Sequence, residues 1–137
     1  MKEVTAIIRI NKMNETKRAL SDAGIYSFTA RKVTGRGRGK MNTLLLKGAE
    51  RGYEEAINQL GAGPKMFPKR MLTIVVPDLK VPVVVKAVID VNKTGSPGDG
   101  KIFVTPLLNA ARIRTMELGD KALDENGEIA KTQTNEV

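Results

Sequence analysis

The sequence predicts an α+β fold in which two helices cover one face of an antiparallel sheet. Three observations predict it: β-rich and helical segments alternate, each helical segment has a strand on either side, and a long glycine-rich connection separates two such units. This order is that of the ferredoxin-like βαββαβ fold. A chain of 137 residues is long enough for one such domain with a modest core.

The first βαβ unit lies at the N-terminus. EVTAIIRI, 3–10, is rich in β-branched residues and predicts a buried strand. ETKRALSDAG then predicts a helix, because its apolar residues recur at helical spacing, with Asn14 as the expected N-cap and Gly24 at the end. YSFTARKV, 26–33, mixes polar and apolar residues and predicts the second strand.

A long connection follows, from Gly35 to about Pro68. Glycines and prolines interrupt any periodicity in it, although AERGYEEAINQL, 49–60, is compatible with a short helix. Connections of this length inside a compact domain are usually functional or disordered. We therefore expect this segment to be a functional loop.

The second unit begins with KRMLTIVVP, 69–77, which predicts a strand. VPVVVKAVIDVN is ambiguous: its β-branched residues favour a strand, but their spacing places them on one helical face, so we predict a helix over 80–92. The residues on that face are Val81, Val84, Val85, Val88 and Ile89. GDGKIFVTPL, 98–107, predicts a turn and a last strand, and the polar residues 121–137 predict a flexible tail.

The composition limits the function. A net charge of +8 and a pI of about 9.9 favour an anionic partner, although charge also serves solubility alone. Only 4% aromatic residues and no Trp disfavour nucleic-acid binding by base stacking. The absence of Cys and His excludes disulfides, thiol nucleophiles and Cys/His zinc sites. No signal sequence or long apolar run is present, so we expect a cytoplasmic protein without a membrane span.

TGSPGDGK, 94–101, has the composition of an anion-binding loop. Its glycines let the backbone approach a ligand closely, and Lys101 adds an ammonium group. It is not a Walker A motif, because Ile102 stands where that motif has Ser or Thr and because a strand follows rather than a helix. A tight turn without a ligand explains the same residues equally well.

Two further basic stretches leave alternatives open. In ARIRT, Arg112 and Arg114 would project to one side of an extended backbone and suit phosphate oxygens, or they would belong to a solvated edge strand. RKVTGRGRGK, 31–40, fits a phosphate-binding loop, an RNA-binding arm or a solvated loop. Lys69, at the start of the third strand, could pair with a carboxylate. No catalytic constellation is found, so we do not expect an enzyme.

Taken together, these motifs resemble the P-II signal-transduction proteins, the trimeric nitrogen sensors. The matching stretches span about residues 1–120 and include FTARKVTGRGR, KGAE, FPKRMLTIVVPD, TGSPGDGKIFV and ARIRT. The resemblance implies a ferredoxin-like domain over 1–120, assembled as a trimer. ATP or ADP would bind between protomers, with 2-oxoglutarate and Mg²⁺ beside the phosphates. The T-loop, about 37–68, would dock on target proteins.

The family's site residues carry over by position. The nucleotide is expected to contact Ile7, Thr29, Gly35, Gly37, Arg38, Val75, Gly98, Asp99, Gly100, Lys101, Arg112 and Arg114. 2-Oxoglutarate is expected beside Gly39, Lys40 and Lys69. Two positions depart from the family: Arg51 stands where uridylylated members have Tyr, and Gly39 stands where a magnesium-binding Gln is usual. Gly39 offers Mg²⁺ no side-chain oxygen, so we assign no metal ligand.

The resemblance extends to the branch encoded beside nitrogenase genes in methanogenic archaea. It implies a non-enzymatic regulator that inhibits a nitrogenase component, by itself or with a related P-II-like subunit, until 2-oxoglutarate relieves the inhibition. The alternative within the family is a general regulator of an ammonium transporter or a biosynthetic enzyme. Outside the family, the same residues would suit a nucleic-acid-binding module or an ATPase. The scarcity of aromatic side chains disfavours the first, and the lack of a general base disfavours the second.

Overall fold

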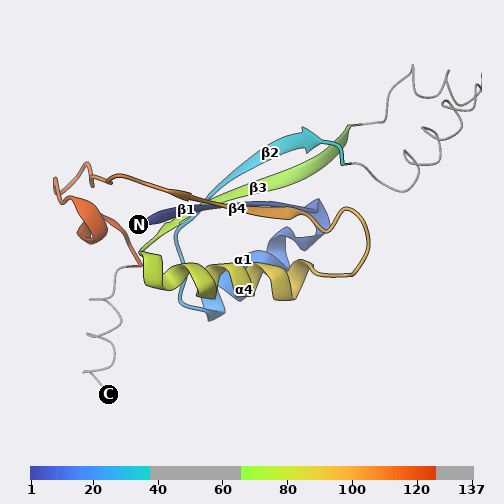
Figure 1. Cartoon of the computed structure of the whole chain (residues 1–137), viewed down its shortest axis with the longest axis horizontal. Coiled ribbons are helices and arrows are strands. Elements are labelled where there is room, and N and C mark those ends of the chain that lie inside the picture. Colours follow the sequence, from blue (N-terminus) through green and yellow to red (C-terminus); the bar gives the residue numbers. More distant parts are fainter. Residues whose placement is uncertain (38–65, 126–137) are drawn as a thin grey trace, which may run out of the picture.

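The computed structural model describes residues 1–37 and 66–125 of the chain. Within them, one sheet has two helices against one of its faces (Figure 1). The elements are β1 (Lys2–Ile8), α1 (Met13–Asp22), β2 (Thr29–Gly35), β3 (Phe67–Val76), α4 (Val81–Asn92) and β4 (Lys101–Pro106). Short 3₁₀ turns cover Ile10–Lys12, Asp78–Lys80 and Gly119–Ala122.

The strand order within the described sheet is β2-β3-β1-β4, and all neighbouring strands are antiparallel. The two central strands, β3 and β1, therefore come from different βαβ units. The edge strands are β2, beside β3, and β4, beside β1. This topology confirms the ferredoxin-like prediction. Ile7 on β1 lies between Met71 on β3 and Lys101 on β4. This register defines the end of the sheet at which β1 stops and β4 starts.

The core lies between the sheet and the two helices. Alternate residues of the central strands face the helices and are fully or almost fully buried, as expected for a sheet with one covered face. They are Val4, Ala6, Ile8, Leu72, Ile74 and Val76, and they meet Leu20 of α1 and Val84 and Val88 of α4. The opposite face, which carries Thr5, Thr73 and Phe103, has no element of the described chain against it.

The ends of α1 show one correct and one wrong prediction. The helix begins at Met13 after a 3₁₀ turn, so Asn14 lies inside it and the N-cap is Lys12, without a side-chain cap bond. Gly24 ends it as expected: its φ is +82°, and Ile25 N–H donates to Leu20 O at 2.8 Å. This bond and the one from Gly24 N–H to Ser21 O form a Schellman motif.

Helical spacing determines the structure of the valine-rich segment. α4 covers Val81–Asn92, one residue shorter than predicted, with a proline in its first turn, where no N–H is needed. Val84 and Val88 are buried, but Ile89 is 44% exposed, because it lies at the side of the helix away from the core centre. Asn92 is buried at the end of α4, and its Nδ2 donates to Thr16 Oγ1 of α1 at 3.0 Å.

The chain beyond β4 leaves the sheet and returns to the connection between α1 and β2 (Figure 1). Leu123 and Glu125 are only 7% and 5% exposed. One carboxylate oxygen of Glu125 accepts the N–H groups of Tyr26 and Ser27, both at 2.8 Å. Residues 121–125, predicted to belong to a flexible tail, are therefore part of the folded domain.

Several predictions concern residues outside the described ranges. They are the interior of the T-loop, the short helix at 49–60 and the tail beyond residue 125. In the described part, β3 begins at Phe67, so the predicted loop ends slightly earlier than expected. None of the helices in the described part is long and apolar enough to cross a membrane.

Candidate functional site

The connection between α4 and β4, residues 93–100, is a tight loop at one end of the sheet. Gly95, Gly98 and Gly100 have φ values of +85°, +97° and +112°, a region that side chains rarely adopt. A Cβ on Gly100 would lie 2.0 Å from the carbonyl oxygen of Ile7, so no larger residue fits there. Pro97 followed by a positive φ at Gly98 is the pattern of a type II turn. The glycines thus allow the backbone conformation of the loop, in addition to leaving room for a ligand to approach it.

Asp99 closes this loop from inside. Its carboxylate accepts the backbone N–H groups of Thr94 at 2.8 Å and Gly95 at 3.0 Å, and also the Thr94 hydroxyl. Arg9 Nη1 lies 2.8 Å from Oδ1 of the same carboxylate and forms an ion pair with it. The Thr94 hydroxyl, its N–H group and the Arg9 guanidinium hold the pKa of Asp99 well below its usual range. Both oxygens are engaged within the protein, so Asp99 braces the loop.

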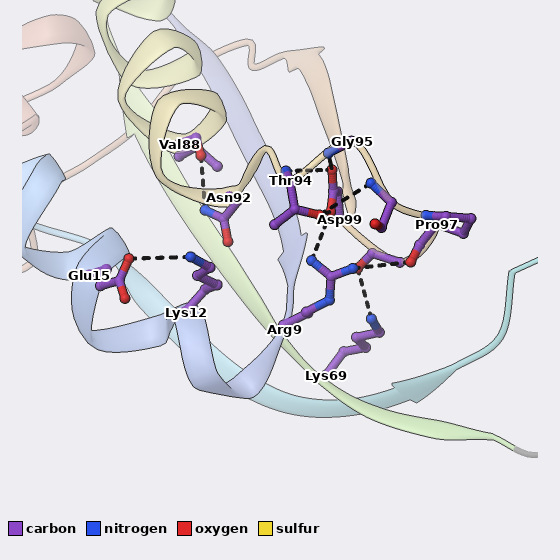
Figure 2. A network of polar contacts seen from close by, with 12 residues as sticks. Arg9, Lys12, Glu15, Lys69, Val88, Asn92, Thr94, Gly95, Pro97 and Asp99 are labelled. Atoms are coloured by element: carbon purple, nitrogen blue, oxygen red, sulfur yellow. Dashed lines mark hydrogen bonds and ion pairs between the residues drawn. The ribbon is translucent and has the colours of Figure 1, made fainter.

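Two cations from the strand ends hold carbonyl groups of the loop (Figure 2). Arg9 Nη2 donates to Pro97 O at 3.0 Å, and Lys69 Nζ donates to Gly98 O at 3.1 Å. Lys69 was expected here as a ligand-binding residue, but Arg9 was not. No local motif marks Arg9; only the pairing of β1 with β4 brings it beside residues distant in sequence.

The expected site residues in the described part of the chain do not all lie together. At the end of the sheet where β1 stops and β4 starts lie Ile7, Gly35, Gly37, Lys69, Gly98, Asp99, Gly100 and Lys101. Thr29 and Val75 lie farther along their strands, whereas Arg112 and Arg114 belong to the segment that follows the opposite end of β4. With about 3.3 Å per residue, the length of β4 alone separates the two ends by roughly 17 Å.

Arg112 and Arg114 do not lie on an extended strand. The backbone turns between them and residue 118, with Met116 N–H donating to Arg112 O at 2.7 Å and a φ of +62° at Met116. The expected parallel projection of the two guanidinium groups is therefore wrong. Arg112 pairs with Asp124 at 2.9 Å and lies 3.7 Å from Glu117, whereas Arg114 is exposed.

An apolar pocket of about 460 Å³ adjoins the loop on the helical side of the sheet. Aliphatic side chains of α4, β1 and β4 form most of its wall, and Gly100 and Lys101 also line it. Among the described residues, no group of three or more His, Cys, Asp or Glu side chains could hold a metal ion.

Comparison with known proteins identifies the family. The family model described as nitrogen regulatory protein P-II matches residues 1–117. The chain belongs to the P-II family. This P-II protein is 44% identical over 127 residues to a nitrogen fixation nifHD region GlnB-like protein 2 from Methanobacterium ivanovii, covering 90% of this chain and 99% of the relative.

Other relatives have similar coverage. A protein of the same description from Methanococcus maripaludis is 45% identical over 123 residues, covering 90% of this chain and all of the relative. A nitrogen regulatory protein P-II from Rhodobacter capsulatus is 38% identical, again over 90% of this chain. The family resemblance from which the expected site residues were assigned is therefore confirmed.

Three of the residues expected in the P-II site fall outside the described ranges. They are Arg38, Gly39 and Lys40, at the start of the T-loop. Gly37, the last described residue before it, is exposed, and a Cβ there would meet no neighbour within 4 Å. Gly35, at the end of β2, has the same free space.

Proposed function

We propose that this P-II protein senses ATP, ADP and 2-oxoglutarate and regulates nitrogen fixation by docking its T-loop on a nitrogenase component. 2-Oxoglutarate relieves the inhibition. The observation that carries the proposal is the braced glycine loop before β4, with Lys101 directly after it, in a chain of the P-II family. Backbone N–H groups and an ammonium group together suit the phosphates of a nucleotide.

The distribution of the expected residues supports a site built by two copies of the chain. Lys101 and Arg112 of one chain lie too far apart to bind the same phosphate group, because the full length of β4 separates them. The glycine loop of one protomer and the arginine pair of its neighbour would together form one site. The uncovered sheet face, with Phe103 at 47% exposure, supplies apolar surface for such an assembly. We propose a trimer, formed by this chain alone or with a related P-II-like subunit.

Lys69 is the proposed ligand of 2-oxoglutarate. Its ammonium group lies 3.1 Å from Gly98 O, at the end of the sheet that carries the glycine loop. A carboxylate would form a stronger, charge-assisted bond with it than this carbonyl does. Mg²⁺, if present, would take oxygen ligands from the phosphates and from 2-oxoglutarate, since Gly39 supplies no side-chain oxygen.

The link to nitrogen fixation is supported by the relatives from methanogens, which are named for the nitrogen fixation nifHD region. We propose a cytoplasmic, non-enzymatic regulator: ligands change the preferred conformation of the T-loop, and only their different affinities for the two conformations drive the change. The second candidate, a general nitrogen regulator acting on a transporter or a biosynthetic enzyme, is favoured by the Rhodobacter capsulatus relative.

Calorimetry with ATP tests the nucleotide site. We expect the wild-type protein to bind ATP, and the double variant Arg112→Ala/Arg114→Ala to show no measurable binding, because two guanidinium groups no longer neutralise the phosphates. The double variant Lys17→Ala/Arg18→Ala removes the same charge from an exposed part of α1 and should bind normally. Equal ATP affinities of the wild type and the arginine variant would reject the assigned site.

Binding to a target separates the two regulatory candidates. Immobilised protein should retain the nitrogenase component in ADP and release it on addition of ATP and 2-oxoglutarate. Retention of an ammonium transporter or a biosynthetic enzyme instead, with no interaction with nitrogenase, would favour the second candidate. ATP binding without any effect of 2-oxoglutarate would contradict the proposed sensing of that metabolite.

A further inference from the structure

We propose that Arg9 is a positioning residue that holds the glycine loop before β4 in its anion-binding conformation. The proposal rests on the proposed function, since it concerns the phosphate end of the same site. Arg9 follows directly after β1, and its guanidinium reaches Pro97 O and Asp99 Oδ1, at 3.0 Å and 2.8 Å. These are two different groups of one turn, and a planar fork of donors can hold both at once.

The bond to Pro97 O decides where the next N–H group points. In a trans peptide the carbonyl and the following N–H lie on opposite sides of the bond, so Gly98 N–H faces away from Arg9. Types I and II turns differ in the orientation of this central peptide. By binding Pro97 O, Arg9 favours the type II form, which the positive φ of Gly98 permits.

Lys69 holds the next peptide of the same turn, since its Nζ donates to Gly98 O at 3.1 Å. In a type II turn the N–H group of the fourth residue, here Asp99, is directed inward, so the central Gly98 N–H is the group of this turn left to face a ligand. Within the described residues Gly98 N–H has no hydrogen-bond acceptor, as expected for a group directed at a ligand.

The positive charge of Arg9 is already paired within the protein. Asp99 lies against it as an ion pair, and Gly98 has no side chain to separate Arg9 from the turn: a Cβ there would lie 3.2 Å from Arg9 Nη2. Arg9 therefore acts on a phosphate through the backbone of the loop rather than as a direct ligand. Its loss should affect the phosphates of a nucleotide and spare the nucleoside.

Calorimetry of the full chain with ATP and with adenosine tests this role. We expect Arg9→Gln to weaken ATP binding about tenfold, in line with the loss of hydrogen bonds to a charged group, and to leave adenosine binding unchanged. Arg9→Lys should restore part of the ATP affinity, because an ammonium group can hold either Pro97 O or Asp99 but not both in the same geometry. Arg18→Gln, an exposed residue of α1, is the charge-matched control.

Asp99→Asn distinguishes positioning from direct contact. If Arg9 acts through the loop, this variant loses the brace and weakens ATP binding. If Arg9 were a direct phosphate ligand, removing its partner would free it and strengthen ATP binding, which would overturn the proposal. Equal losses of ATP and adenosine affinity in Arg9→Gln, or no loss of either, would also overturn it.

Hydrogen exchange without ligand separates this proposal from the proposed function. Arg9→Gln should speed exchange of the Thr94 and Gly95 amides, which Asp99 holds, while the amides of β1 and β3 exchange as in the wild type. If the wild type fails to bind ATP, the proposed function is wrong, and this measurement alone then decides whether Arg9 braces the loop. Unchanged exchange of both amides would show that it does not.

Discussion

At the scale of single residues, this protein uses carboxylates to hold its basic groups in place. Asp99 braces the loop before β4 through its ion pair with Arg9. Asp124 forms an ion pair with Arg112, a residue expected to bind phosphate. Asp124 also accepts a hydrogen bond from the Ser27 hydroxyl at 2.5 Å. This hydrogen bond, followed by the Arg112 guanidinium, lowers the pKa of Asp124. A phosphate that approaches Arg112 must therefore compete with an internal anion.

Replacement of Asp124 should reveal this competition. We expect Asp124→Asn to raise the affinity for ATP roughly two- to fivefold, the usual range for a partly exposed ion pair. Asp120→Asn removes the same charge from an exposed position nearby without a side-chain partner in the described structure. Calorimetry of the two variants gives the comparison. A lower affinity in Asp124→Asn would mean that Asp124 orients Arg112 for binding instead.

The stabilisation from Asp99 should depend on pH in a defined direction. Its pKa in the folded protein lies below the ordinary value of 3.8, so the unfolded chain takes up a proton first as the pH falls. The stabilisation is then fully present above about pH 5 and is lost progressively below the unfolded pKa. Urea unfolding of the wild type and Asp99→Asn should give a constant difference in free energy of unfolding from pH 7 to 5. A difference that disappears within that range would contradict the assignment.

At the scale of elements, the predictions from sequence succeeded where spacing and conformation are local. The spacing of valines identified α4 although β-branched residues favour strands, because Val84 and Val88 are buried against the sheet. Gly24 was predictable as the end of α1, since few other residues adopt its φ. The start of α1 was missed because a 3₁₀ turn leads into the helix and makes a side-chain cap at Asn14 unnecessary.

Gly24→Ala should destabilise the protein through its backbone alone. Its φ of +82° costs an alanine about 1–2 kcal/mol, although a Cβ there meets nothing within 4 Å. Gly35→Ala is the matched control: a Cβ is equally free of contacts, and its φ lies outside the left-handed region. Thermal unfolding should show a clearly lower midpoint for Gly24→Ala than for Gly35→Ala. Equal midpoints would argue against a strained cap.

At the scale of the whole molecule, the functional residues could be predicted individually but not in their arrangement. The glycine loop and the arginine pair have recognisable motifs, and family resemblance assigns them to one site. Only the register of β4 shows that one chain keeps them apart, and only the return of the chain after β4 shows that Arg112 is paired internally. Arg9 was missed because its contacts, with residues 97 and 99, depend entirely on strand pairing.

The uncovered sheet face gives a test of the assembly. We expect light scattering to find three times the 14.9 kDa mass of the chain. Phe103→Asp should lower the measured mass and abolish ATP binding together, since a charge would be buried between protomers and the site would lose one of its halves. Leu79→Asp, at a position 92% exposed in the 3₁₀ turn that precedes α4, should change neither. A monomeric wild type that binds ATP would contradict a site shared between chains.

Glu125 determines where the protein can be shortened. Its carboxylate is the acceptor for two adjacent backbone N–H groups, of Tyr26 and Ser27, at the start of the connection to β2. A truncation after residue 120, where the family motifs end, would leave both donors without this partner, at a cost of about 1–3 kcal/mol for each that stays buried. It would also remove Leu123 from its buried position. The smallest stable fragment at this end is therefore expected to stop at Glu125, and limited proteolysis should leave that residue in place.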